Sequence, residues 1–218
     1  MQKIIHPHIH AEIKQKLPFI RLGIFRFSGK VLPVSEPCRE NIAKLLSDEA
    51  ETADAVVDAT RKAYKLLGKD PSRYRPSAEA LRRRIAKGQS LYSINNVVDI
   101  LNAISAHSGF SIGGYDVAKI EGNNIFLSIG TADDVYEALG RGLLNIEYLP
   151  VLRNTEGRAF GSPTSDSVLT SIDAQTQDFL WVFFDFGGGS FAPIISLAQN
   201  LLTEFAALTE SDFRVSEA

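Results

Sequence analysis

The 218-residue sequence predicts a single domain of the α+β class. An apolar strand pattern near the N-terminus is followed by several helical patterns, then by short strand patterns, and last by one amphipathic helix. Because strands and helices do not alternate regularly, a parallel sheet of βαβ units is not expected. The hydrophobic content of 44% is that of an ordinary globular protein and is sufficient for a sizeable core.

The first half of the chain predicts one strand and three helices. Residues 17–27 form an apolar run bounded by turn residues, which predicts a buried strand. Residues 39–67 repeat apolar side chains at three- and four-residue steps, and they predict one long helix with a left-handed cap at Gly68. Shorter helices are expected over 78–86 and 96–107, because a glycine soon follows each of these periodic segments.

The second half is richer in short strands, which glycine and asparagine residues separate. Three apolar runs predict strands, and these are 125–129, 143–152 and 179–186. A capping pattern predicts a short helix over 131–139. The three consecutive glycines at 187–189 predict a flexible break, and the apolar period over 191–208 predicts a closing amphipathic helix.

The composition excludes several classes of protein. No apolar run reaches the roughly eighteen residues that a membrane span needs, and the first residues lack the features of a signal peptide. Cys38 is the only cysteine, so neither an internal disulfide nor a cysteine-only metal site can form. These features favour a reducing compartment, and we expect the cytoplasm.

The net charge and the distribution of charged residues bear on whether the protein binds nucleic acid. The formal net charge of −3 argues against a protein that binds nucleic acid by bulk electrostatics, and it does not exclude a basic face. One dense cationic run consists of Arg82, Arg83, Arg84 and Lys87. Taken by itself, such a run is more often a solvated helix face than a binding surface.

Three alternating histidines, His6, His8 and His10, would face one side of an extended chain. Three converging imidazoles could bind zinc. Short histidine tracts are common and non-specific, however, so a polar strand edge or tail is the favoured interpretation. No metal site is therefore predicted.

A polar stripe on the helix expected over 96–107 is the more informative feature. Asn95, Asp99 and Asn102 share one helical face, whereas a solvated helix usually carries lysine and glutamate there. Buried amides and carboxylates need partners, so this face either borders a binding site or caps a loop. Both alternatives remain open on chemistry alone.

Three segments together resemble the B3/B4 region of the phenylalanyl-tRNA synthetase β subunit, and the free-standing B3/B4 proteins still more. They are 73–81, 94–102 and 113–122. The resemblance is dense over 72–122 and fainter from Arg158 to Asp185. It implies a three-layer fold built on a β-sandwich of unusual topology, with a family-like core at about 17–186 within a single domain. Residues 1–16 would then be an N-terminal extension, and 187–218 a linker and closing helix.

The synthetase module hydrolyses tyrosine that is wrongly attached to phenylalanine tRNA, a mistake that a hydrophobic pocket cannot prevent by itself. This chain departs from the pattern of that module at three positions. Leu101 stands where the pattern has threonine, Gly113 where it has histidine, and Val182 near the expected glutamate. The groups that position water and read the tyrosine hydroxyl are therefore expected to be absent.

The resemblance nevertheless suggests a set of site residues. The candidate catalytic residues are Asn102, Asp99 and Asp116. The candidate pocket residues are Asn95, Gly113, Gly114, Tyr115 and Arg158. The candidate RNA contacts are Arg73, Arg75, Arg82, Arg83, Arg84 and Lys87. Two purely structural roles remain as alternatives, with Tyr115 in the core and Asp99 as a loop cap.

The resulting functional hypothesis is a free-standing module that binds RNA or aminoacyl-tRNA without obvious catalytic groups. The alternative is a trans-editing deacylase, in which Asn102 would orient water and an aspartate would act as base. A metallohydrolase based on the N-terminal histidines is a distant third. Aminoacylation, a cofactor, a DNA partner and a membrane partner are not expected.

Overall fold

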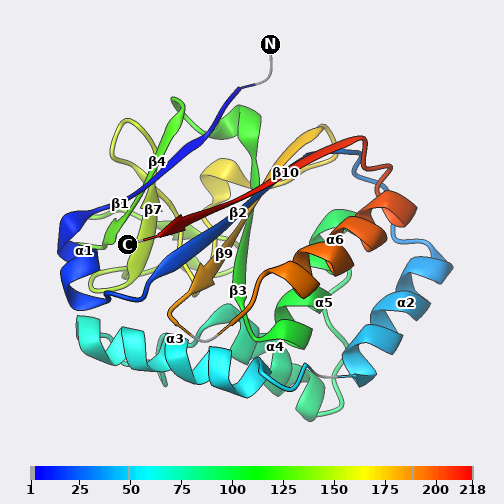
Figure 1. Cartoon of the computed structure of the whole chain (residues 1–218), viewed down its shortest axis with the longest axis horizontal. Coiled ribbons are helices and arrows are strands. Elements are labelled where there is room, and N and C mark those ends of the chain that lie inside the picture. Colours follow the sequence, from blue (N-terminus) through cyan, green and yellow to red (C-terminus); the bar gives the residue numbers. More distant parts are fainter. Residues whose placement is uncertain (1–2, 49, 188, 218) are drawn as a thin grey trace.

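Two four-stranded sheets lie face to face in the computed structural model, which describes residues 3–48, 50–187 and 189–217 (Figure 1). The first sheet has the order β1 (His6–Ile9), β4 (Asn124–Ile129), β7 (Pro150–Arg153), β8 (Ala159–Gly161). The second has the order β10 (Glu210–Glu217), β2 (Arg21–Ser28), β9 (Asp178–Asp185), β3 (Ser111–Asp116). A small ribbon consists of β5 (Glu137–Ala138) and β6 (Gly142–Leu143). The β1–β4 pair is parallel, and the other pairs within these sheets are antiparallel.

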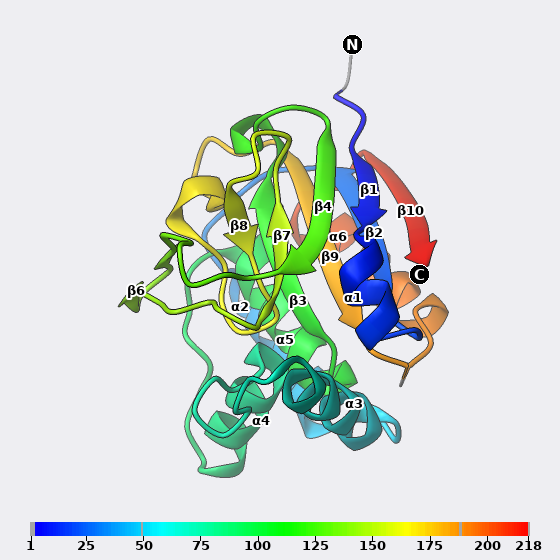
Figure 2. The same cartoon turned by 90° about the vertical axis from the view of Figure 1, so that its left-hand side faces the viewer.

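Helices cover the outer face of the second sheet and one end of both sheets (Figures 1 and 2). The helices are α1 (Ala11–Lys16), α2 (Glu36–Ser47), α3 (Ala53–Leu67), α4 (Ser77–Ala86), α5 (Asn96–Ser108) and α6 (Ala192–Phe205). Two 3-10 turns are η1 (Val117–Lys119) and η2 (Val168–Thr170). Side chains of α2, α5 and α6 pack on the second sheet, while α3 and α4 lie across the end of the sheets (Figure 2).

Alternation along β9 separates two clusters of core side chains. Phe179, Trp181 and Phe183 pack with the helices, whereas Leu180 and Val182 pack between the sheets. Successive strand residues point to opposite faces, so a strand buried on both sides is apolar throughout. The layers are therefore sheet, sheet and helices. This confirms the predicted α+β, three-layer arrangement, and it places the fully buried Val182 in the core.

The prediction of a single helix over 39–67 is wrong, because two helices, α2 and α3, occupy this region. The end of α5 packs against the junction between them. The backbone N–H of Ala50 donates to the carbonyl of His107 at 3.2 Å, and a Cβ on Gly109 would lie 2.2 Å from the Ala53 carbonyl oxygen. Tertiary contacts thus override the helical period at this point.

The prediction of a short helix over 131–139 is also wrong. The Asp134 carboxylate accepts hydrogen bonds from the Thr131 N–H at 2.7 Å and from the Arg153 guanidinium at 2.6 and 2.7 Å. Although burial raises it, the pKa of Asp134 is held below its usual range by these hydrogen bonds, chiefly those from Arg153. The segment therefore folds as a turn tied to β7, and β7 itself covers only part of the strand expected over 143–152.

The C-terminal region contains the expected helix, α6, followed by a strand, β10, that the sequence did not indicate. Residues along β10 are mostly exposed and polar. A strand at the edge of a sheet buries little surface, so its sequence lacks the apolar signal of a central strand. Of the three glycines at 187–189, Gly188 lies outside the described residues.

The N-terminal histidines lie on and directly after β1. The His8 ring stacks on Phe126 with centroids 5.1 Å apart, and its Nε2 lies 3.0 Å from the Asn124 side-chain oxygen. Among the described residues, no three side chains of the histidine, cysteine or acidic type lie close enough together to hold a metal ion. None of the described helices has the length and apolarity to cross a membrane.

Candidate functional site

Helix α4 carries its charges in the order that stabilises a helix. Glu79 lies in the first turn, near the positive end of the helix dipole, while Arg83 and Arg84 lie in the last turn, near the negative end. Pro76 precedes the helix, and Gly88, with φ of 70°, ends the turn that follows it. This arrangement leaves cationic side chains near the end of α4 and at the start of the next loop.

A pocket of about 380 Å³ lies beside α4, and we call it the arginine pocket. It is lined by Arg75, Ser77, Ala80, Leu81, Arg83, Arg84, Lys87, Gln89, Tyr92, Asn102 and Arg141. Five of these lining residues are lysine or arginine, and none of the described lining residues is acidic. The volume lies in the range of sites for small ligands, and the charge favours an anion.

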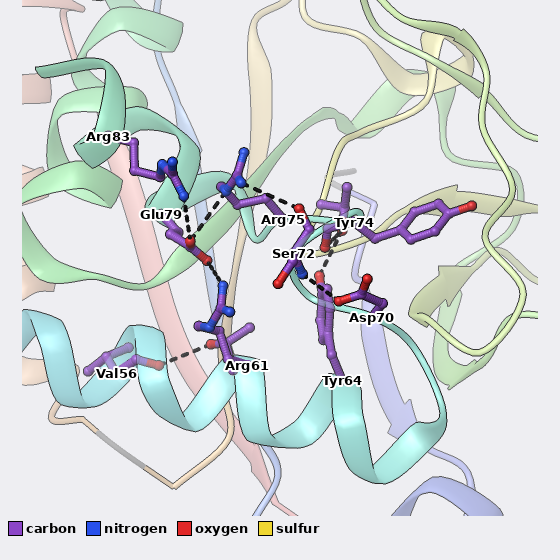
Figure 3. Close-up of polar contacts among 11 residues, drawn as sticks. Val56, Arg61, Tyr64, Asp70, Ser72, Tyr74, Arg75, Glu79 and Arg83 are labelled. Atoms are coloured by element: carbon purple, nitrogen blue, oxygen red, sulfur yellow. Dashed lines mark hydrogen bonds and ion pairs between the residues drawn. The ribbon is translucent and has the colours of Figure 1, made fainter. Parts of the chain in front are cut away.

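One carboxylate outside the lining holds two of these cations in place (Figure 3). Glu79 contacts Arg61 at 2.7 Å, Arg75 at 3.3 Å and Arg83 at 3.9 Å. Its side chain keeps only 14% of its surface exposed. A single negative charge therefore orients three guanidinium groups, and the cluster remains positive towards the pocket.

Arg84 is held against an aromatic ring on the same wall. Its guanidinium carbon lies 4.0 Å from the centroid of the Tyr92 ring, and its Nη1 donates to the Tyr92 hydroxyl at 3.0 Å. The Nε atom of Arg84 donates to the Ser90 carbonyl at 2.5 Å. These contacts fix the loop that follows α4 against the helix.

The polar stripe of α5 separates into two different roles. Asn95 caps the helix by accepting from the Val98 N–H at 2.9 Å. Asp99 accepts from the Ser93 hydroxyl at 3.0 Å and from the Ile94 N–H at 2.8 Å, so it ties down the preceding loop. Only Asn102 of this stripe lines the arginine pocket, and its amide has no hydrogen-bond partner among the described residues.

Two of the proposed RNA contacts do not line the pocket. Arg82 donates to the Ala106 carbonyl at 3.1 Å and to the Asp54 carboxylate at 2.8 Å, so it connects α4 with α5 and α3. Arg73 is exposed and lies over the Tyr74 ring, with 5.6 Å between the guanidinium carbon and the centroid. The other four, Arg75, Arg83, Arg84 and Lys87, meet in the pocket.

The region around Gly113 and Gly114 is packed. A Cβ on Gly113 would lie 1.9 Å from the Tyr115 hydroxyl oxygen, and a Cβ on Gly114 would lie 2.6 Å from Leu101. These glycines allow neighbouring side chains to approach the backbone closely. The space beside them is thus filled by the protein itself, and neither glycine lines the arginine pocket.

A buried tyrosine and an aspartate complete this packed region. The Tyr115 hydroxyl donates to Asp166 Oδ1 at 2.7 Å, and the Gly114 N–H donates to Asp166 Oδ2 at 3.1 Å. Burial raises the pKa of Asp166 to about 7, even though both hydrogen bonds lower it. Burial and the Asp166 charge raise the pKa of Tyr115 well above its usual value.

The last two predicted residues also have partners outside the pocket. Asp116 accepts from the Ala118 N–H at 2.9 Å and from the Thr176 hydroxyl at 2.8 Å, so it caps η1. Arg158 is exposed, and its guanidinium lies 3.7 Å from the Glu121 carboxylate. Neither residue lines the arginine pocket.

The sequence did not indicate four residues of the arginine pocket and the packed region. Gln89, Tyr92 and Arg141 line the pocket, and Asp166 anchors Tyr115. The first two could have been noticed, because both closely follow the basic run of α4. Arg141 and Asp166 come from distant loops, and no local pattern identifies them.

Comparison with known proteins agrees with the segments identified above. The family model described as "B3/4 domain" matches residues 59–186. Among solved structures, the chain is similar to an N-terminal fragment of the phenylalanyl-tRNA synthetase β subunit from Pyrococcus horikoshii, with 11% identity and a TM-score of 0.46. The match covers 97% of this chain and 50% of that one. No curated protein matches.

Proposed function

Because this chain belongs to the B3/4 domain family, we propose that it is a module that binds the RNA of an aminoacyl-tRNA through the arginine pocket. The observation that carries the proposal is the convergence of five cations around one pocket whose described lining has no acidic residue. Phosphate oxygens are the natural partners of such a cluster. A cytoplasmic location, where tRNAs are charged, belongs to the same proposal.

The positions of the carboxylates favour binding over hydrolysis. Asp99 and Asp116 each accept two hydrogen bonds that organise the backbone or a neighbouring side chain. A general base must reach the water that it activates. Neither aspartate lines the arginine pocket, so neither is positioned to act there.

Hydrolysis of a mischarged aminoacyl-tRNA remains the alternative function, and one observation favours it. The Asn102 amide lies in the pocket wall without a partner among the described residues, so it could orient a water molecule or a substrate carbonyl. Asn102 would need a base or a substrate hydroxyl to assist it. Binding requires no such group and is the proposal that we prefer.

Charge reversal in the pocket tests the proposal. The double variant Arg83→Glu/Lys87→Glu places two carboxylates on the wall, and we expect tRNA affinity to fall at least tenfold at about 150 mM salt. The slope of log affinity against log salt should become shallower by about two. Fluorescence anisotropy with labelled tRNA measures both quantities.

A matched control separates the pocket from the overall charge. Arg39→Glu/Lys44→Glu makes the same change in net charge on exposed positions of α2, and we expect less than a threefold effect. Equal losses in the two double variants would contradict a role for the pocket. A panel of mischarged tRNAs tests the alternative, because ester loss that Asn102→Ala abolishes would establish the deacylase.

A further inference from the structure

Tyr92 is an unusual residue for the surface that it occupies. It is 64% exposed, although a tyrosine ring is large and mostly apolar. It lies between α4 and α5, and it lines the arginine pocket. Arg84 contacts the ring through its guanidinium group and through the hydroxyl, so the ring is fixed in place while most of its surface faces solvent.

The groups around Tyr92 supply the other contacts that a nucleotide needs. Arg75, Arg83, Lys87 and Arg141 provide positive charge in the same pocket. The side-chain amides of Asn102 and Gln89 can both donate and accept hydrogen bonds. An aromatic ring, cations and amides thus correspond to the base, the phosphate and the polar edges of one nucleotide.

We propose that the arginine pocket holds an unpaired nucleotide of RNA, with the base stacked on Tyr92 and the phosphates among the guanidinium groups. This inference rests on the proposed function and specifies which part of the RNA is bound. Bases in a duplex are stacked on one another, so their faces are not free to meet a protein ring. A pocket of about 380 Å³ accommodates a nucleotide and not a double helix.

Three probes distinguish base stacking from simple charge attraction. They are a fluorescein-labelled single-stranded RNA of about ten nucleotides, a blunt duplex of the same length, and inorganic tripolyphosphate as a competitor without a base. We expect the wild-type protein to bind the single strand at least tenfold more tightly than the duplex. Tripolyphosphate should compete with the single strand, because it occupies the cationic part of the pocket.

Substitutions at Tyr92 then isolate the ring. Tyr92→Ala should weaken single-strand binding about tenfold, because stacking on one aromatic residue has an effect of that order. Tyr92→Phe should stay within threefold of the wild type. Tripolyphosphate binding should change less than threefold in either variant. Phe19→Ala removes another exposed aromatic ring, outside the pocket lining, and should change nothing.

The outcomes separate this inference from the function on which it rests. If Arg83→Glu/Lys87→Glu abolishes RNA binding while Tyr92→Ala binds like the wild type, the stacking role is wrong and the RNA-binding function stands. Equal affinity for the duplex and the single strand would also overturn the inference. If the wild-type protein binds labelled tRNA but not the single strand, this inference alone fails, and if it binds neither of them, both proposals fail.

Discussion

Two neighbouring residues of α5 lie in different environments: Leu101 in a packed interior region, and Asn102 on the wall of the arginine pocket. Leu101 packs against Gly114 in a region where the polar groups of Tyr115 and Asp166 are bonded to each other. Asn102 lies on the arginine pocket, and its amide has no partner among the described residues. Internally satisfied polar groups stabilise the fold, whereas unpaired polar groups beside a pocket are available to a ligand.

The largest expected effect comes from disturbing the packed region. Gly113→Val places a side chain where the Tyr115 hydroxyl and the Asp166 carboxylate already lie, at 1.9 and 2.9 Å from the added Cβ. Tyr115 is fully buried and cannot move aside. We expect the free energy of unfolding to fall by about 3 kcal/mol, measured by urea denaturation.

Gly114→Ala is the matched control for this substitution. Its added Cβ would meet the terminal methyl group of Leu101 at 2.6 Å, and a flexible leucine can adjust its rotamer. The loss should therefore be about 1 kcal/mol. A Gly113→Val protein as stable as the wild type would mean that the region holds a cavity able to admit a ligand.

The next effect depends on pH. The pKa of Asp166 is about 7 in the folded protein and about 3.9 in an unfolded chain. The native state therefore binds more protons between these values, so its stability falls as pH rises through this window. The full difference corresponds to about 4 kcal/mol, and because Asp166 is only partly buried we expect about 2 kcal/mol.

Asp166→Asn isolates this contribution, because the amide keeps the shape of the carboxyl group without titrating. The stability of the wild type relative to this variant should decrease between pH 4 and 8. Asp173→Asn is the control with the opposite sign, because a hydrogen bond from Lys119 holds the pKa of Asp173 below its usual range. The stability that the Asp173 carboxylate contributes to the folded protein is lost as pH falls. If the stability difference between the wild type and Asp166→Asn does not change with pH, the Asp166 carboxylate is ionised and hydrated in the folded protein.

The core was predictable from sequence because its signal is local. The alternation along β9 follows from strand geometry, and the caps of α3 and α5 at Gly68 and Gly109 follow from their left-handed backbones. The edge strand β10 was missed because it buries little surface. Residues 131–139 do not form the expected helix because an arginine from a later strand, Arg153, binds Asp134.

The site was only partly predictable for a related reason. Helical spacing predicts that Asn95, Asp99 and Asn102 share one face, but spacing does not reveal which loop folds back onto which residue. The loop at 93–94 binds Asp99 and leaves Asn102 without a partner among the described residues. Arg141 lies in the turn between β5 and β6, which is distant in sequence from α4 and α5. Its contribution to the pocket depends on tertiary structure, which spacing does not encode.

The smallest expected effect tests whether the cations of the pocket are held in place by Glu79. Glu79→Gln removes the charge that Arg61, Arg75 and Arg83 share, and we expect the free energy of unfolding to fall by about 1 kcal/mol. Asp54→Asn removes the exposed partner of Arg82 and should change stability by only about 0.3 kcal/mol. Urea denaturation of both variants compares them directly. If Glu79→Gln costs no more than Asp54→Asn, the guanidinium groups are mobile, and the pocket is no better organised than any other charged surface.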